Sequence, residues 1–204
     1  KSTKATIATN AKVMYNGKSG SFEDFKVIDS GNIVLLDSDN NGVFDIVFVN
    51  ETKNYVVEEV IASSNRVTDK YGKTSLVLDP EDDKLDFVVT HGGKEIKISD
   101  LLEWDVLSVA KSKDSAIVII EVTREKITGR ITEEQDGKFV IDGKEYGVSK
   151  NYPEEIKLND EGTFYLDKDG NIAAVDAEKS LSSKPAFPLS VSFHKEVKSS
   201  GLFF

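Results

Sequence analysis

The sequence contains no cysteine, and its 204 residues include only 1 tryptophan, 2 histidines and 4 prolines. Without cysteine there is no disulfide framework, thiolate nucleophile, zinc ribbon or iron–sulfur cluster. No apolar run reaches the roughly 18 residues that a transmembrane helix requires, so we expect no membrane insertion. The 36 acidic residues outnumber the 26 basic ones and give a net charge of −10. We therefore expect no nucleic-acid partner, because phosphate binding requires local positive charge.

The apolar residues that are present are mostly β-branched. Val and Ile together number 37, whereas Leu and Ala together number 23. Short apolar runs of strand length recur and are bounded by Gly, Asn and Asp, which favour turns. Residues 21–24 and 99–102 are candidates for single helical turns. The sequence therefore predicts an all-β chain with very little helix.

One sequence unit, consisting of a strand, a Gly-Lys turn, a spacer and a hairpin, occurs three times. The turns are at residues 17–18, 93–94 and 143–144, and the hairpins that follow are expected at residues 33–49, 106–122 and 163–175. Five or six strands separate equivalent points of successive units. This spacing predicts two tandem small antiparallel barrels of SH3-like or OB-like size. One continuous elongated β structure is the alternative.

The predicted organisation has three parts. We place the first barrel at residues 1–95, the second at residues 96–178 and a C-terminal tail at residues 179–204. Apolar residues alternate with polar or small ones between residues 187 and 193, which favours one additional strand in the tail. The start at a lysine rather than a methionine suggests a mature protein or a fragment of a longer one.

Several ordered β motifs carry a family resemblance. They are residues 31–49 (GNIVLLDSDNNGVFDIVFV), 126–132 (KITGRIT), 141–146 (IDGKEY), 162–167 (GTFYLD) and 170–175 (GNIAAV). They resemble segments of Gram-positive cell-surface proteins that carry S-layer homology repeats, over about residues 11–177. The resemblance implies an extracellular chain associated with the cell wall and S-layer. No S-layer homology repeat is found in the sequence, so the resemblance implies that the wall anchor lies outside this chain.

One loop has the residue types of a calcium site. Asp37, Asp39, Asn41 and Asp45 place oxygen side chains at alternating positions around a glycine, as Ca²⁺ sites require. The twelfth position is apolar, however, and the flanking segments are predicted strands rather than helices. The alternative is an ordinary hairpin turn in which the Asp side chains accept hydrogen bonds from turn amides. Ca²⁺ is the one cofactor that the sequence suggests.

Aromatic residues give a second candidate site. Trp104, Tyr146 and Tyr152 are candidate glycan-binding residues, because glycan-binding modules present exposed aromatic rings. The alternative for Trp104 is packing between the two barrels, since it follows two leucines just before a hairpin.

We find no sequence pattern that indicates catalysis. Carboxylates are abundant, but no pair stands out as the acid and base of a glycoside hydrolase. His91 and His194 lie far apart in the sequence, and no nucleophile elbow is present. We therefore expect a non-catalytic structural or interaction region whose partners are other surface proteins or a second copy. A glycan-binding or cell-wall-polysaccharide-binding module is the alternative, and a carboxylate-dependent hydrolase is a third.

Overall fold

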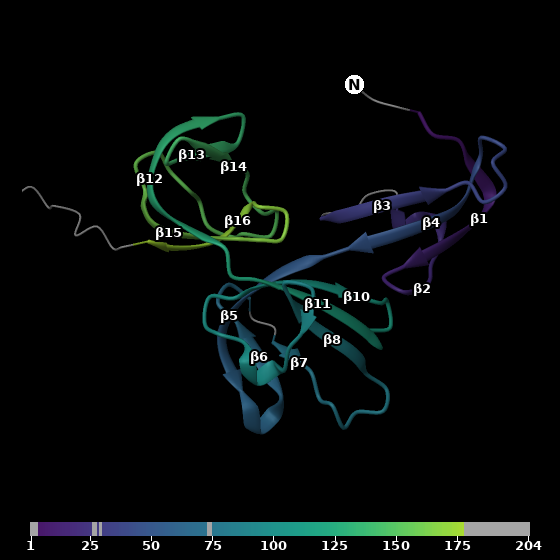
Figure 1. Ribbon diagram of the computed structural model, residues 1–204, viewed down its shortest axis with the longest axis horizontal. Helices are drawn as coiled ribbons and strands as arrows, with labels where there is room; N and C mark the ends of the chain where they lie inside the picture. The colour runs from purple at the N-terminus through teal and green to yellow at the C-terminus, as the bar shows by residue number, and fades with distance from the viewer. Residues whose placement is uncertain (1–3, 26–27, 29, 73–74, 178–204) are drawn as a thin grey trace, which may run out of the picture.

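The computed structural model describes residues 4–25, 28, 30–72 and 75–177, and their secondary structure is almost entirely β (Figure 1). The prediction of an all-β chain is confirmed. The helical segments are single 3-10 turns, η1 (Phe22–Phe25), η2 (Ala62–Ser64) and η3 (Ile98–Asp100). The expected tail strand lies outside the described residues and stays a prediction. In the part of the chain that is described, no helix has the length and apolar character needed to cross a membrane.

The strands form three sheets that follow one another along the chain. The first sheet has the order β2-β1-β4-β3 and contains β1 (Ile7–Tyr15), β2 (Lys18–Ser19), β3 (Gly31–Leu36) and β4 (Phe44–Glu51). The second sheet has the order β7-β6-β5-β10-β11-β8-β9 and contains β5 (Lys53–Ile61), β6 (Arg66–Asp69), β7 (Leu76–Val77), β8 (Asp86–His91), β9 (Lys94–Glu95), β10 (Val106–Lys111) and β11 (Ile117–Thr123). The third sheet has the order β14-β13-β12-β15-β16 and contains β12 (Lys126–Gln135), β13 (Lys138–Ile141), β14 (Lys144–Tyr146), β15 (Glu161–Leu166) and β16 (Ile172–Ala177).

The described strands do not form the two closed antiparallel barrels that the sequence predicted. Among the described strands, no pairing joins the two edges of any sheet, so all three sheets are open. The edge strands β2 and β9 are two residues long, which leaves little backbone to pair with a further strand. The pairing is also mixed, because β1 lies parallel to β4 and β8 lies parallel to β11.

The predicted boundary between residues 95 and 96 falls inside the second sheet. Strands from both sides of that boundary are hydrogen-bonded to one another, since β8 pairs with β11 and β5 pairs with β10. The physical reason is that the hairpin after the second Gly-Lys turn folds back beside β8, the strand that precedes the turn, as the first hairpin does beside β1. The chain therefore divides between sheets at the short connections after β4 and after β11.

The three expected hairpins are present as the antiparallel pairs β3–β4, β10–β11 and β15–β16. The first two share the same strand order on one side, because β2-β1-β4-β3 recurs within the second sheet as β9-β8-β11-β10; on the other side β3 is an edge strand, whereas β10 pairs with β5. In the third sheet, β13 pairs with β12 instead. The parallel contact of the third hairpin among the described residues is one bridge, between Ile172 at the start of β16 and Val148 in the segment after β14.

Each sheet has its own apolar core, and the cores differ in size. The buried residues of the first sheet's core are Val13, Val47 and Val49. The second core is larger and includes Val57, Val67, Leu76, Leu78, Val89, Leu101, Leu107, Val109, Val118, Ile120 and Val122. The third contains Ile131, Phe139, Ile141, Tyr146, Ile156, Phe164, Leu166 and Ile172. The first sheet therefore has the least apolar burial of its own to stabilise it.

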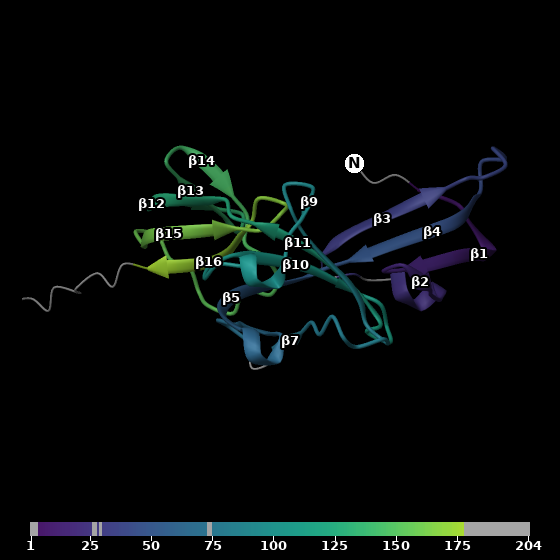
Figure 2. The same cartoon turned by 60° about the horizontal axis from the view of Figure 1, so that its bottom comes forward.

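The sheets are joined by short connections. Only Thr52 separates β4 from β5, so one nearly continuous stretch of extended chain leaves the first sheet and enters the second. Figures 1 and 2 show the first and third sheets on different sides of the second. A fourth apolar cluster, around Val56, Val106 and Ala174, lies between the second and third sheets.

Candidate functional site: a cleft where the three sheets meet

The predicted calcium loop forms the turn between β3 and β4. The Asp37 carboxylate accepts hydrogen bonds from the backbone N–H groups of Asn41 (3.2 Å) and Gly42 (2.8 Å). Asp39 also accepts from the Asn41 N–H, at 3.3 Å. The Gly42 N–H that donates to Asp37 is the main cause of the lowered pKa of this carboxyl. These contacts are those of a hairpin turn capped by its own side chains.

The fourth predicted ligand of the loop has a different partner. The Asp45 carboxylate accepts hydrogen bonds from the backbone N–H, at 2.9 Å, and the hydroxyl of Ser38. Within the described ranges, no group of three or more His, Cys, Asp or Glu side chains is arranged to hold a metal ion. Calcium binding by Asp37, Asp39, Asn41 and Asp45 stays a prediction. Calorimetry with Ca²⁺ on the chelator-treated chain and on Asp37→Ala tests it.

The three predicted glycan-binding aromatics all pack against other parts of the protein, Tyr146 and Tyr152 in the core of the third sheet and Trp104 between the second and third sheets. Tyr146 is 7% exposed and belongs to the core of the third sheet. Trp104 stacks on Tyr165 with the ring centroids 4.9 Å apart, and Tyr152 meets the ring of Tyr71 edge-on at 5.4 Å. Trp104, Tyr146 and Tyr152 therefore do not form one exposed strip, because the ring of Tyr146 is buried and the other two are only half-exposed. The stack of Trp104 on Tyr165 agrees with the alternative interpretation, in which Trp104 packs between two parts of the chain.

His91 lies at the end of β8, far along the chain from His194, which is outside the described residues. Its Nδ1 atom is 3.0 Å from the carbonyl oxygen of Val122 on the neighbouring strand β11. The ring is half-buried and is held by this contact.

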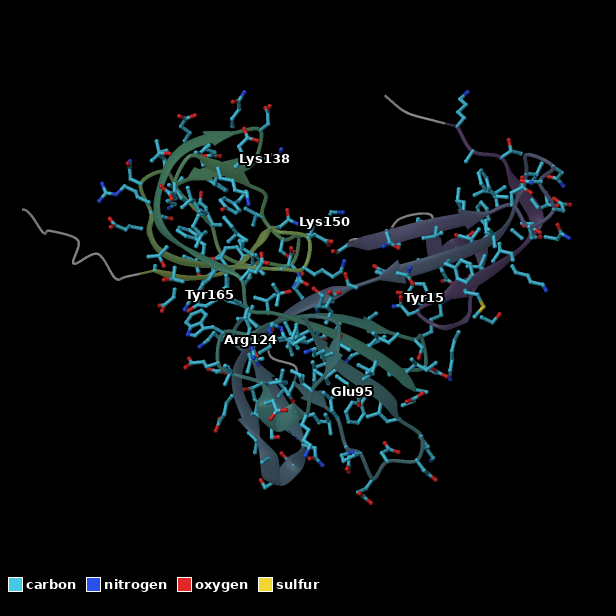
Figure 3. All side chains as sticks on the ribbon, in the orientation of Figure 1. Tyr15, Glu95, Arg124, Lys138, Lys150 and Tyr165 are labelled. Carbon is cyan, nitrogen blue, oxygen red and sulfur yellow. The ribbon has the colours of Figure 1, made fainter. Side chains whose placement is uncertain are left out.

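The structure places a concave site where the sequence indicated none. A cleft of about 640 Å³ lies where the three sheets meet. Its lining comes from the end of β1, the residue before β3, the end of β4 and its connection to β5, from β5 and β10, and from the segment after β14. The lining residues are Tyr15, Asn16, Ser30, Glu51, Thr52, Lys53, Tyr55, Val109, Lys111, Lys150 and Asn151. Tyr15 and Lys150 can be followed in Figure 3, on the first sheet and on the loop before β15 respectively.

Hydrogen bonds fix the side of the cleft that belongs to the first sheet. The Tyr15 hydroxyl donates to Glu51 Oε2 at 2.7 Å. Burial and this bond to a carboxylate raise the pKa of Tyr15 to about 12. The buried amide of Asn16 donates from Nδ2 to the backbone oxygens of Glu51 (2.9 Å) and Lys111 (2.8 Å). One amide side chain therefore ties β1, β4 and β10 together beside the cleft.

Three lysines contribute positive charge to the opposite side. Lys53 Nζ lies 5.6 Å and Lys111 Nζ lies 5.8 Å from the centroid of the Tyr55 ring. Burial, and secondarily the nearby charge of Lys53, lower the pKa of Lys111. Lys150 completes the set from the turn that follows β14.

Strand geometry explains why these side chains share one face. Alternate residues of a strand point to the same side, so Lys53 and Tyr55 project together from β5. In the pairing of β5 with β10, Lys53 is opposite Val109, and Lys111 follows two residues later on the same face. The sequence signal that could have indicated the site was the Lys-Asn-Tyr alternation in β5, but its partner strand is more than 50 residues away.

The opposite face of β5 builds a buried polar network with the third sheet. Asn54 Nδ2 donates to Ser149 Oγ and to Asp167 Oδ2, both at 2.9 Å, and Asn54 Oδ1 accepts from Ser108 Oγ at 2.9 Å. Asn151 Nδ2 donates to the Asn54 carbonyl at 2.6 Å. Asn54 and Asp167 are 5% and 3% exposed, and no buried side-chain polar atom in the described residues lacks a partner. The network therefore fixes the wall of the cleft that the third sheet supplies.

Comparisons with protein families, with characterised proteins and with solved structures give no match for this chain.

Proposed function

We propose that this chain is a non-catalytic structural and interaction region of an extracellular, S-layer-associated bacterial cell-surface protein. The observation that carries the proposal is the junction between the second and third sheets. There, apolar packing, the Trp104–Tyr165 stack and the Asn54 network join two sheets with separate cores. A stalk or array component requires successive modules to keep a defined orientation, and a satisfied buried network together with close packing favours one orientation.

Charge and sequence resemblance support the same proposal. A net charge of −10 keeps an extended surface protein soluble and offers carboxylates that divalent cations can bridge. The resemblance to proteins with S-layer homology repeats supplies the location, on the cell surface. The proposed partners are other cell-surface proteins or further copies of this chain.

A distance measurement tests the structural role. Because the chain has no cysteine, cysteines introduced at Glu58 in β5 and Glu133 in β12 can be labelled selectively with nitroxides. We expect one narrow distance distribution between these labels. A broad distribution in the folded chain would contradict the role of an oriented spacer. For the location, antibodies against the chain are expected to label intact source cells, and labelling only after lysis would contradict it.

A second candidate function is binding of cell-wall glycan, and the junction cleft favours it. The cleft is concave, and two tyrosines, Tyr15 and Tyr55, are among its lining residues. Pockets of roughly 300–1,000 Å³ with a few placed polar groups are typical of small-ligand sites. Glu51 is the one carboxylate among the described residues that line the cleft, whereas glycoside hydrolysis uses a pair. The cleft therefore supports binding better than it supports the hydrolase alternative.

A further inference from the structure

We propose that the junction cleft binds an anionic saccharide, and that the ammonium groups of Lys53, Lys111 and Lys150 recognise its acidic groups. This inference rests on the second candidate function, glycan binding. It adds the site, the charge of the ligand and the residues that recognise that charge. The ligand class is a polyhydroxylated chain that carries carboxylate or phosphate groups.

The distribution of charge is the first argument. The chain as a whole is strongly acidic, yet the cleft lining holds three lysines and one glutamate. The glutamate, Glu51, accepts the hydrogen bond of Tyr15. In the described part of the chain, none of the three lysine ammonium groups has a carboxylate oxygen within 4.0 Å. A local cationic site in an acidic protein concentrates anions from solution.

The placement of two of the lysines is the second argument. Lys53 and Lys111 both lie within 6 Å of the centroid of one ring, that of Tyr55, so like charges are held near each other. Partial burial, and secondarily the repulsion from Lys53, disfavour the charged form of Lys111. An anionic group between them would offset that repulsion and would form charge-assisted hydrogen bonds with both.

The size and lining of the cleft indicate a saccharide rather than a simple ion. A volume of about 640 Å³ greatly exceeds what one inorganic anion fills. Four residues that carry hydroxyl groups line it beside the lysines, namely Tyr15, Ser30, Thr52 and Tyr55. Hydroxyls and ammonium groups together match a ligand that carries many hydroxyls and repeated acidic groups.

Calorimetric titration with matched probes tests the proposal. Trigalacturonate carries carboxylates, its trimethyl ester has the same sugars without the charge, and a glycerol phosphate oligomer carries phosphates. We expect one or both anionic probes to bind, the ester to bind at least about tenfold more weakly, and affinity to fall between about 20 mM and about 500 mM NaCl.

Variants locate the site. We expect Lys53→Gln/Lys111→Gln/Lys150→Gln to lower the affinity for the anionic probe by about tenfold or more. The matched control, Lys84→Gln/Lys94→Gln/Lys138→Gln, removes the same charge away from the cleft and should change affinity by less than about twofold. Circular dichroism of both variants shows whether each remains folded, and Lys150→Gln alone, on the exposed loop, provides a second test if the triple variant unfolds.

The outcomes separate the inference from the function on which it rests. Equal affinity for the ester and the acid, or an equal loss of affinity in the two triple variants, would overturn the anionic site and leave glycan binding in place. Absence of binding by all three probes would overturn both. Tighter binding of inorganic phosphate or of a glutamate pentapeptide than of either saccharide probe would overturn the assignment to a saccharide.

Discussion

The two junctions between sheets are built differently. The second and third sheets meet through an apolar cluster, two aromatic pairs and a buried polar network. The first and second sheets meet through the continuous β4–β5 stretch, the buried amide of Asn16 and two ion pairs, Lys18–Asp114 and Lys113–Asp24. Buried contacts are insensitive to salt, whereas ion pairs with exposed members are screened by it. The difference indicates one fixed junction and one adjustable junction.

The cleft proposed to bind a saccharide lies at the adjustable junction. Residues from the first sheet, Tyr15 and Asn16, form one side, and Lys53, Tyr55 and Lys111 of the second sheet form the other. The first sheet also has the smallest apolar core. We infer that the third and second sheets act as a rigid frame, and that the first sheet can shift to adapt the width of the cleft to its ligand.

The largest expected effect comes from breaking the fixed junction at Asn54. In Asn54→Ala, Ser149 and Ser108 lose a partner, and the buried carboxylate of Asp167 loses the amide that donates to it. Losing these buried hydrogen bonds, with the Oδ2 atom of Asp167 left without its donor, is expected to lower the free energy of unfolding by about 3 kcal/mol. Urea denaturation measures it. The control is Asn50→Ala, an exposed amide in β4 that bonds to Asn32, and a similar loss in both variants would contradict the importance of the network.

Trp104 offers a second way to weaken the fixed junction. Its ring stacks on Tyr165, and the Lys70 ammonium group lies 4.0 Å from the centroid of the Trp104 ring. We expect Trp104→Ala to lower the free energy of unfolding by about 2 kcal/mol, less than for a fully buried Trp because the ring is half-exposed. Thermal and urea denaturation measure the change.

The backbone at Trp104 sharpens this test. Its φ of 71° lies in the left-handed region, which is strained for a bulky residue and which glycine adopts without steric strain. Trp104→Gly is therefore expected to be more stable than Trp104→Ala by about 1 kcal/mol. If the glycine variant were the less stable of the two, the strain at this position would be disproved. The strained conformation indicates that packing between the sheets outweighs the local preference of residue 104.

Local sequence patterns predicted the strands but not their partners. The excess of Val and Ile and the Gly-Lys turns act over a few residues, and the hairpins that they predicted are present. The parallel pairing of β8 with β11 joins segments about 30 residues apart, and the count of strands carries no information about such pairing. For that reason, the number of strands suggested closed barrels, whereas the chain forms open sheets.

Local sequence patterns also failed to predict the part of the candidate site that is built from distant segments. The calcium loop could be proposed because its residues are contiguous, and the structure places them in one turn. Lys53, Lys111 and Lys150 come from three segments, and only the folding of β5 beside β10 and of the third sheet beside both brings them together. Trp104, Tyr146 and Tyr152 were predicted from residue type alone, which does not indicate whether a ring faces solvent or a neighbouring sheet.

A smaller effect is expected at the adjustable junction from Asn16→Ala. The variant loses two hydrogen bonds donated by Nδ2 and one accepted by Oδ1 from the Glu51 N–H. We expect a loss of about 1–2 kcal/mol. Hydrogen exchange followed by mass spectrometry should show faster exchange in β1 to β4 and unchanged exchange in β12 to β16. Uniformly faster exchange would mean that the sheets unfold together and would contradict the proposed difference between the junctions.

The smallest expected effect is that of salt on the exposed contacts of the adjustable junction. Lys18 and Asp114 are both well exposed, as is Lys113, so their attraction to their partners is screened at high ionic strength. Nitroxides at Lys12 in β1 and Glu58 in β5 report the first junction, and the labels at Glu58 and Glu133 report the second. At about 1 M NaCl we expect the first distance distribution to broaden and the second to stay unchanged.

The variant Lys18→Gln/Lys113→Gln should broaden the first distance distribution at low salt, because it removes both cations. Added salt should then change that distribution little. If the first distribution stays narrow in that variant, the β4–β5 stretch and Asn16 are sufficient to hold the first sheet, and the cleft has a fixed width.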